Sequence, residues 1–296
     1  MRDRAIEWVY GAGWGLSRAM PESLATRLFR YAADRTFRGD GPQVRRLRAN
    51  LRRVVGTSVD DAGLDALTRD AMRSYLRYWM EAFRLPSYSR ADVLERFELE
   101  GWEVFDQHRR EGTGVVLAIP HSGNWDLAGA WVCANGWPLT TVAQRLKPEA
   151  VYEKFLKFRR GLGMEILPHS GGERPAAAVL AERLSAGHIV PLVADRDLTS
   201  QGIEVEFFGA KTRMPAGPVL LSIRTHAPLY TVVLRYDSPT HCYGKIEGPV
   251  PIPDTGRLAA RVAAGTQLVA DAFAAGIAVQ PADWHMLQPL WLDDLD

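Results

Sequence analysis

Residues 114–126 read Gly114-Val-Val-Leu-Ala-Ile-Pro-His-Ser-Gly-Asn-Trp-Asp126, and this stretch decides the fold class. Its first half is a continuous apolar run bounded by glycine and proline, a pattern typical of a strand buried on both faces of a sheet. Its second half leads into a predicted helix at residues 125–134. A polar segment between such a strand and a helix lies at the carboxyl end of the strand, where open α/β sheets place their ligands.

Further apolar runs alternate with helical segments over the rest of the chain. This alternation predicts an α/β fold with a mixed, largely parallel central sheet flanked by helices. Pro191 is unfavourable within its run, because proline cannot donate to a strand ladder. The expected strands are 139–143, 164–167, 189–194, 229–235 and 243–246, and the expected helices are 149–161, 174–186, 216–226 and 257–276.

The first 85 residues have helical rather than strand spacing. Apolar residues recur at helical intervals with arginines between them, and Leu85-Pro86 ends the last run because the residue before proline disfavours helix. No repeat or low-complexity linker separates this part from the rest. We therefore predict a single domain over residues 1–296, with 1–85 as a helical N-terminal region. Its expected helices are 3–18, 22–38, 43–55 and 61–85.

Composition excludes several classes of protein. The chain is 47% hydrophobic and 24% charged with a net charge of +1, which excludes intrinsic disorder. The two cysteines, Cys133 and Cys242, cannot form a disulfide framework and are interpreted as buried thiols in a reducing compartment. We expect no stretch with the roughly 20 apolar residues of a spanning helix. Glu7 also interrupts the apolar region of a signal peptide, so we predict a cytoplasmic protein.

Charge is distributed unevenly along the chain. Residues 1–60 contain twelve arginines and six acidic residues, a balance of +6, whereas the remainder carries −5. Such asymmetry indicates an anionic partner, either a membrane surface or nucleic acid. No nucleic-acid-binding motif accompanies the charge, so we predict contact with an anionic membrane surface and no nucleic-acid partner. The arginine-rich run 45–53 is either a solvated face or a membrane or CoA contact. The aromatic residues expected at the membrane interface are Trp8, Tyr10, Trp14 and Phe29.

His121 and two carboxylates are the candidate catalytic groups. Asp126 follows His121 by five residues, and a histidine with a nearby carboxylate can act as a general base whose tautomer is fixed. This spacing is short and common, so a structural histidine is the alternative. Asp195 ends another predicted strand, and a neighbouring strand could bring it straight to the imidazole. We predict that Asp195 is the direct partner of His121 and that Asp126 binds backbone N–H groups at the helix start. Ser122 lacks a nucleophile elbow and is expected to cap the helix or bond the backbone.

Polar and basic residues near other strand ends suggest an anionic substrate. Arginine binds phosphate groups bidentately, although solvated or internally paired arginines are the alternative interpretation. No pair of histidines has zinc-ligand spacing, so we predict no metal. The candidate substrate-binding residues are Gln144, Arg145, Arg159, Arg196 and Arg213.

A set of short segments together resembles one family. The sequence is similar, from about residue 8 to the C-terminus, to the phosphatidylinositol mannoside acyltransferases of actinobacteria, a branch of the bacterial lipid A and lysophospholipid acyltransferase superfamily. The segments are HSGNWD at 121–126, QRLKPE at 144–149, GGERP at 171–175, ADRDLT at 194–199, FFG at 207–209, TRMPAGP at 212–218 and PADWHMLQPLW at 281–291.

The resemblance implies an activity, a location and residue roles. It implies a peripheral enzyme on the cytoplasmic face of the plasma membrane that moves a long acyl chain, typically palmitoyl, from acyl-CoA. The acceptor is the 6-hydroxyl of the mannose on the inositol 2-position. His121 takes the place of the base, Asp126 of the second motif residue, Asp195 of an acid that partners the histidine, and Arg159 of an arginine in the site. The family is expected to have glutamate where this chain has Asp195 and Gln144.

The residue chemistry fits acyl transfer. A thioester is already activated, so the reaction needs acyl-CoA as co-substrate and no further cofactor. His121 would deprotonate the acceptor hydroxyl, which attacks the thioester carbonyl and expels the CoA thiolate. Two alternatives are a lipid A-type or other lysolipid acyltransferase with a different acceptor, and a non-catalytic lipid-binding protein, which needs no base.

Overall fold

The central sheet confirms the predicted α/β class. The computed structural model describes residue 15 and residues 17–144, 149–169, 171, 173–197 and 199–294, without the side chain of Val151. Within these residues five strands form the main sheet, in which β8 and β9 are antiparallel and every other neighbouring pair is parallel. Its strand order is β1 (Phe97–Glu100), β9 (Cys242–Glu247), β8 (Leu229–Tyr236), β2 (Val115–Ile119) and β5 (Ile189–Val193).

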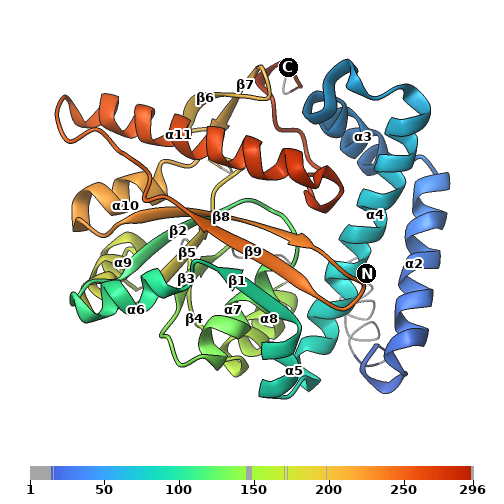
Figure 1. Ribbon diagram of the computed structural model, residues 1–296, viewed down its shortest axis with the longest axis horizontal. Helices are drawn as coiled ribbons and strands as arrows, with labels where there is room; N and C mark the ends of the chain where they lie inside the picture. Colours follow the sequence, from blue (N-terminus) through green and yellow to red (C-terminus); the bar gives the residue numbers. More distant parts are fainter. Residues whose placement is uncertain are drawn as a thin grey trace.

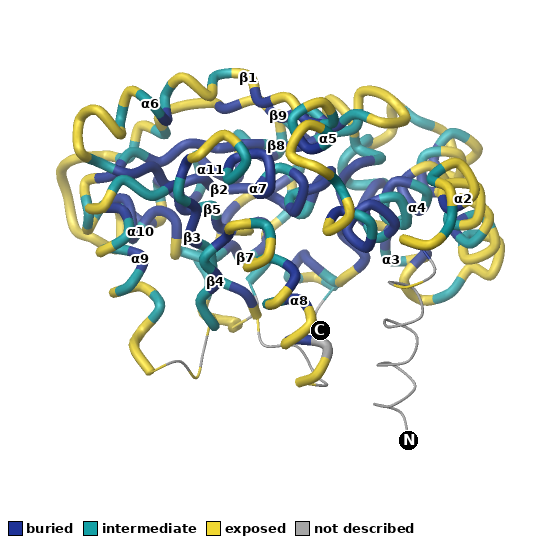
Figure 2. Tube along the Cα trace, turned by 90° about the horizontal axis from the view of Figure 1, so that it is seen from below, coloured by how far each residue is buried: buried dark blue, intermediate teal, exposed yellow. Residues whose placement is uncertain are grey.

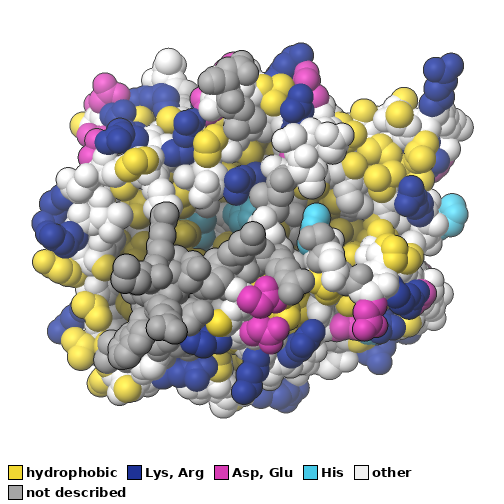
Figure 3. Space-filling view, turned by 180° about the vertical axis from the view of Figure 1, so that it is seen from behind, with side chains coloured by type: hydrophobic (Ala, Val, Ile, Leu, Met, Phe, Trp, Pro, Cys, Tyr) yellow, Lys and Arg dark blue, Asp and Glu magenta, His cyan; other side chains and the backbone are white. Residues whose placement is uncertain are grey.

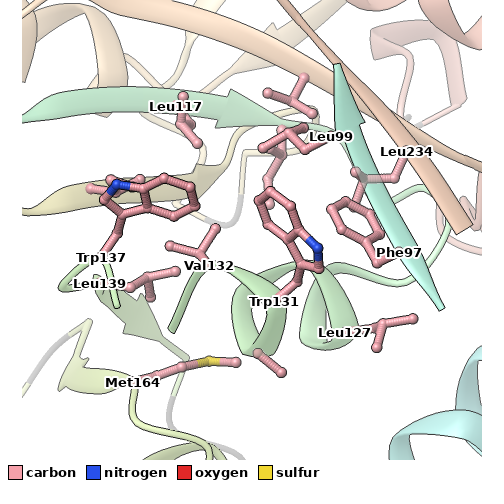
Figure 4. Close-up of a cluster of buried hydrophobic side chains, with 14 of the residues drawn as sticks. Phe97, Leu99, Leu117, Leu127, Trp131, Val132, Trp137, Leu139, Met164 and Leu234 are labelled. Carbon is pink, nitrogen blue, oxygen red and sulfur yellow. The ribbon is translucent and has the colours of Figure 1, made fainter. Parts of the chain in front are cut away.

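Helices cover both faces of this sheet (Figure 1). Successive residues of β2 point to opposite faces, so Val115 and Leu117 belong to one apolar cluster while Val116 and Ala118 belong to another. This two-sided burial explains the continuous apolar run in the sequence. Figure 4 shows the first cluster, in which Trp131 of α7 packs among sheet residues. The flanking helices are α5 (Arg90–Glu95), α6 (Glu103–Arg110), α7 (Trp125–Ala134), α8 (Glu149–Gly161), α9 (Ala176–Ser185), α10 (Gly217–Thr225) and α11 (Leu258–Val279).

Two smaller sheets lie outside the main one. Parallel β3 (Thr140–Ala143) and β4 (Glu165–Pro168) were expected from the sequence, whereas antiparallel β6 (Ile203–Phe207) and β7 (Ala210–Met214) were not. The short strand β1 and helices α5 and α6 were also missed. Pro191 does lie within a strand, opposite Leu117, because β5 is an edge strand of the main sheet and tolerates proline there.

The N-terminal region is helical, as predicted. Helices α2 (Glu22–Arg38), α3 (Pro42–Val55) and α4 (Asp61–Arg84) lie beside the α/β core (Figure 1). They share a third apolar cluster that includes Leu47, Leu64 and, from the C-terminal segment, Leu287. The outer side of α2 is exposed, whereas the strands are largely buried (Figure 2). The expected helix 3–18 lies almost wholly outside the described residues.

Helix α11 corrects one expectation. By length and composition alone it is apolar enough to cross a membrane, although the sequence was expected to contain no such stretch. Its buried residues, among them Val262, Val269 and Phe273, belong to the apolar cluster on the second face of the sheet. Core helices of soluble proteins have this composition, so we assign α11 to the core.

Substitutions on the two sides of α11 test this assignment. Phe273 is fully buried and Val279 is 65% exposed. Phe273→Ala should lower the free energy of unfolding by about 3–5 kcal/mol because it removes a packed ring, and Val279→Ala should change it by less than about 0.5 kcal/mol. Urea denaturation measures both. Equal, small losses would show that α11 is not a core helix.

Candidate functional site

A cavity of about 610 Å³ lies between one face of the main sheet and α7. Figure 3 shows a hollow on one face of the molecule, with histidine atoms inside it and hydrophobic side chains around it. The inner wall is apolar, and Figure 4 shows several of its side chains between the sheet and α7. Polar side chains line the cavity where β2, β3, β4 and β5 end. The apolar lining includes Leu99, Leu117, Val132, Leu139, Met164 and Val232, and the polar lining includes His121, Gln144, His169, Arg196, Thr199 and Gln201.

The ends of β2 and β5 bring His121 and Asp195 together. Ile119 of β2 pairs with Val193 of β5, and the two strands are parallel. His121 follows Ile119 by two residues, and Asp195 follows Val193 by two residues, so both leave the same edge of the sheet. Nδ1 of His121 lies 2.6 Å from Oδ1 of Asp195, and the backbone N–H of His121 donates to Oδ2 at 2.9 Å. The predicted direct pairing of Asp195 with His121 is therefore confirmed, while their catalytic roles stay predictions.

Asp195 is completely buried and ionised. Burial opposes its ionisation, but the electrostatic interaction with His121 and hydrogen bonds from His121 and Trp284 outweigh burial and hold the pKa of Asp195 below its usual value. An ionised carboxylate only accepts hydrogen bonds, so Nδ1 of His121 carries the proton. Nε2 is then the ring nitrogen that is free to accept a proton from a group in the cavity.

Asp126 has a different set of partners from the one expected. Its carboxylate accepts two hydrogen bonds from Arg159, at 2.7 and 3.2 Å, and one from the Tyr78 hydroxyl at 2.9 Å. The prediction that Asp126 binds backbone N–H groups was wrong. Asn124 occupies the cap position instead and accepts from the backbone N–H of Leu127 at 2.9 Å, which leaves Asp126 in the first turn to face the interior.

The ion pair between Asp126 and Arg159 is accompanied by raised pKa values for Arg159 and Tyr78. Burial alone would lower the pKa of Arg159, but the adjacent carboxylate of Asp126 outweighs it and raises that pKa. Burial together with the same carboxylate raises the pKa of Tyr78 well above its usual value. Arg159 therefore stays charged and Tyr78 stays neutral near neutral pH. The side chains of Asp126 and Arg159 form part of the cavity wall.

One face of α4 holds three parts of the site. The Ser74 hydroxyl donates to Asp283 at 2.6 Å, Tyr78 donates to Asp126, and Glu81 accepts from the Asn124 amide at 2.8 Å. Residues 74, 78 and 81 have the spacing of a single helix face. Sequence reasoning missed these residues, although polar side chains in register on an otherwise apolar helix face are a usable signal.

The loop after β2 is pinned by its neighbours. The Ser122 hydroxyl accepts from the backbone N–H of Leu234 at 3.1 Å, which confirms its expected backbone-bonding role. Gly123 has a φ of +54°, and a Cβ there would lie 2.7 Å from Cβ of Leu234. Only glycine fits this close approach of the loop to β8.

The other predicted residues divide into three groups. Gln144, Arg159 and Arg196 line the cavity, together with the exposed His169. Arg213 lies on β7 opposite Glu204 and is not among the described residues that line the cavity, although its carbonyl accepts from the backbone N–H of Asp197, which does line it, at 3.2 Å. Arg145 lies outside the described residues. Within the described ranges, no cluster of three or more His, Cys, Asp or Glu side chains is arranged to hold a metal ion.

Comparisons with known proteins agree with the motifs. A family model for bacterial lipid A biosynthesis acyltransferases matches residues 1–293. The phosphatidylinositol mannoside acyltransferase of Mycolicibacterium smegmatis is 48% identical over 292 residues, which cover 97% of this chain and 91% of that protein. The protein of the same name from Mycobacterium tuberculosis strain H37Rv is 46% identical over 296 residues, 98% of this chain and 90% of that protein. The resemblance found in the sequence is thereby confirmed.

The stability of the fold depends on pH through His285, which is buried against Ser74 of α4. Its Nε2 lies 2.9 Å from the Ser74 hydroxyl, whose proton goes to Asp283, so Nε2 donates. Burial, with a smaller effect from the His121 charge, lowers the pKa of His285 to about 3. The unfolded chain, with its usual pKa near 6.5, binds this proton more readily than the folded one.

Stability should therefore fall as the pH drops below about 6.5, by roughly 2–3 kcal/mol at about pH 4.5 from this group alone. His285→Gln removes the titration, so its unfolding free energy should change less between about pH 7 and pH 4.5. The exposed His226 offers a comparison substitution, His226→Asn, which opens no buried space. Chemical denaturation at each pH measures the slopes, and a wild-type slope in His285→Gln would contradict the assignment.

Proposed function

Since the chain belongs to the family of bacterial lipid A biosynthesis acyltransferases, we propose that it transfers a long acyl chain from acyl-CoA to the mannose 6-hydroxyl of phosphatidylinositol mannosides. Acyltransferase activity follows from the family. The acceptor is inferred from the printed names of relatives that are 46–48% identical over almost the whole chain. The palmitoyl donor and the position of acylation rest on the motif resemblance.

The observation that carries the proposal is Nε2 of His121 at the border of an apolar cavity. In the proposed reaction Nε2 takes the proton of the acceptor hydroxyl as its oxygen attacks the thioester carbonyl. The tetrahedral intermediate collapses, the C–S bond breaks, and the CoA thiolate leaves and can take up the proton from the imidazolium. Asp195 supports the proton transfer because its negative charge stabilises the imidazolium.

The cavity suits the two halves of an acyl donor. Its apolar interior would hold the acyl chain, where each buried methylene contributes about 0.8 kcal/mol to binding. Arg196, Gln144 and His169 at the polar end would contact the sugar or phosphate groups of the substrates. In this proposal acyl-CoA is a co-substrate and no other cofactor takes part.

We also propose that the protein binds the cytoplasmic face of the plasma membrane peripherally, through α2. Leu24, Leu28 and Tyr31 are 49–59% exposed at the spacing of one helix face, and the exposed Arg27 and Arg30 lie on the same helix. Such a surface combines apolar insertion with attraction to anionic lipid. Of the four expected aromatic anchors, Phe29 packs against Phe83 instead, and Trp8, Tyr10 and Trp14 lie outside the described residues.

The arginine-rich run of α3 was expected to be a solvated face or a membrane or CoA contact, and ion pairs within the protein favour neither contact. Arg48 pairs with Asp65, Arg52 with Asp61, and both Arg46 and Arg53 approach Asp294.

We propose that residues 1–296 act as one domain. The reason is that α4, which belongs to the N-terminal helical region, holds three parts of the site through Ser74, Tyr78 and Glu81.

The activity test is acyl transfer by the purified protein, followed by mass spectrometry. Palmitoyl-CoA with mono- or dimannosylated phosphatidylinositol should give the acylated product. His121→Ala should lower turnover by about 10²–10⁴-fold because the base is lost. No product from wild type with either acceptor would contradict the enzymatic proposal, and acylation of a lipid A precursor instead would redirect it to another acceptor class.

Two carboxylate variants separate catalysis from folding in the same assay. Asp195→Asn should lose orders of magnitude in turnover, whereas Asp126→Asn leaves Arg159 buried without its ionised partner and should also cost about 3–5 kcal/mol of stability. If Asp195→Asn is nearly fully active while Asp126→Asn is inactive and equally stable, the two roles are reversed.

Membrane binding is tested by vesicle flotation. Binding should require anionic lipid and weaken with added salt, since each basic residue near the surface contributes about 1 kcal/mol. Leu28→Ser should weaken binding about tenfold by removing an inserted side chain. Leu258→Ser is the matched control, because Leu258 is 47% exposed on α11, outside the proposed surface. Equal binding to neutral vesicles at every salt concentration would refute the electrostatic contribution.

A further inference from the structure

The second oxygen of the Asp195 carboxylate is held by the C-terminal segment. The indole Nε1 of Trp284 donates to Oδ2 at 2.9 Å, and the backbone N–H of His121 donates to the same oxygen at 2.9 Å. A carboxylate can rotate about its Cβ–Cγ bond, and two donors on Oδ2 fix that rotation. Oδ1 is thereby left facing Nδ1 of His121 at 2.6 Å.

The backbone around Trp284 runs alongside the loop that carries His121. Trp284 and Ser122 form an antiparallel bridge. The backbone N–H of Gly123 donates to the carbonyl of Asp283 at 3.0 Å, and that of His285 donates to the carbonyl of His121 at 2.7 Å. The same three-residue segment therefore holds the base through its backbone and the partner of the base through the indole.

The segment itself is fixed from outside the site. The Asp283 carboxylate accepts from Ser74 of α4 at 2.6 Å and from the backbone N–H of Tyr236 at 2.7 Å. The Trp284 ring is completely buried, with the rings of Phe207 and Trp291 at centroid distances of 5.9 and 6.2 Å. These contacts hold the segment and pack the indole, whose N–H faces Asp195.

We propose that Trp284 is a positioning residue for acyl transfer, whose indole N–H orients the Asp195 carboxylate toward His121. Trp284 is outside the described lining of the cavity, so it acts through Asp195 rather than on substrate. The inference rests on the proposed function, in which the pair of His121 and Asp195 accepts the hydroxyl proton. It assigns to the C-terminal motif a role in aligning the base.

The test compares two tryptophan variants. Trp284→Phe keeps an aromatic ring but removes the N–H group. Trp291→Phe is the matched control, because Trp291 is equally buried in the same ring cluster but donates to the carbonyl of Phe207 at 3.1 Å. Trp284→Phe should lower kcat by about ten- to a hundredfold, the effect expected for a lost hydrogen bond to a charged group. Its KM for palmitoyl-CoA should stay within about twofold, and Trp291→Phe should keep a near-wild-type kcat at a similar melting temperature.

A double substitution tests whether the effect passes through the carboxylate. In the Asp195→Asn background, Trp284→Phe should reduce kcat no further, since the group that it orients is already lost. A full additional reduction would show that Trp284 acts by another route and would overturn the proposal.

A spectroscopic readout does not need turnover. In the free protein labelled with ¹⁵N-histidine, the Nδ1 proton signal of His121 should shift or broaden in Trp284→Phe and stay in place in Trp291→Phe. If Trp284→Phe does not fold, the wild type and Asp195→Asn are compared after ¹⁵N-tryptophan labelling. Asp195→Asn should then move the indole signal of Trp284 and leave that of Trp291 in place. Unchanged kcat and an unchanged His121 signal in Trp284→Phe would overturn the proposal. A wild type without activity would refute the proposed function, and the spectra would still decide whether Trp284 orients the pair.

Discussion

A carboxylate that is ionised and wholly excluded from water, Asp195, is the constraint on which the site depends. Removing an ion from water costs several kcal/mol unless its hydrogen-bonding positions are filled. Here three donors fill them: the ring and the backbone of His121 and the indole of Trp284. These donors come from two segments more than 150 residues apart, so the β2–β5 register and the path of the C-terminal segment must both be correct before the carboxylate can be buried.

The N-terminal helices also hold the residues of the site in place. Helix α4 meets the C-terminal segment through Ser74, the Asp126–Arg159 pair through Tyr78, and the helix cap through Glu81. The carboxylates of Asp195 and Asp126 consequently differ in kind. Asp195 faces a ring that can change its protonation, whereas Asp126 faces Arg159, which stays charged. Helix α2, which bears the proposed membrane surface, packs against α4, so the membrane surface and the site share one scaffold.

The sequence was sufficient for features that depend on local pattern and on the rules of parallel sheets. The apolar run at 114–119 identified a central strand, and two strand ends were enough to pair His121 with Asp195. Other features depend on contacts between distant residues, such as Tyr78 with Asp126 and Trp284 with Asp195, which no local spacing encodes. The strands β1 and β6 do show the alternation of half-buried strands, but they are only 4 and 5 residues long and carry glutamates, which are depleted in strands. Helix α11 was expected, but its alanines and scattered polar residues hid its overall apolar character.

The two faces of the sheet are filled differently, and this difference explains where a substrate can bind. On one face α11 completes the apolar cluster with Val269, Phe273 and Ile277. On the other, α7 presents Ala128 and Gly129 to the cavity, and glycine at 129 lets Met164 approach the helix, since a Cβ there would lie 2.7 Å from Cε of Met164. The apolar surface around the cavity is left unfilled, which costs stability as any cavity does. Under the proposed function an acyl chain fills that space, so the same hydrophobic burial that favours substrate binding also completes the packing of the fold.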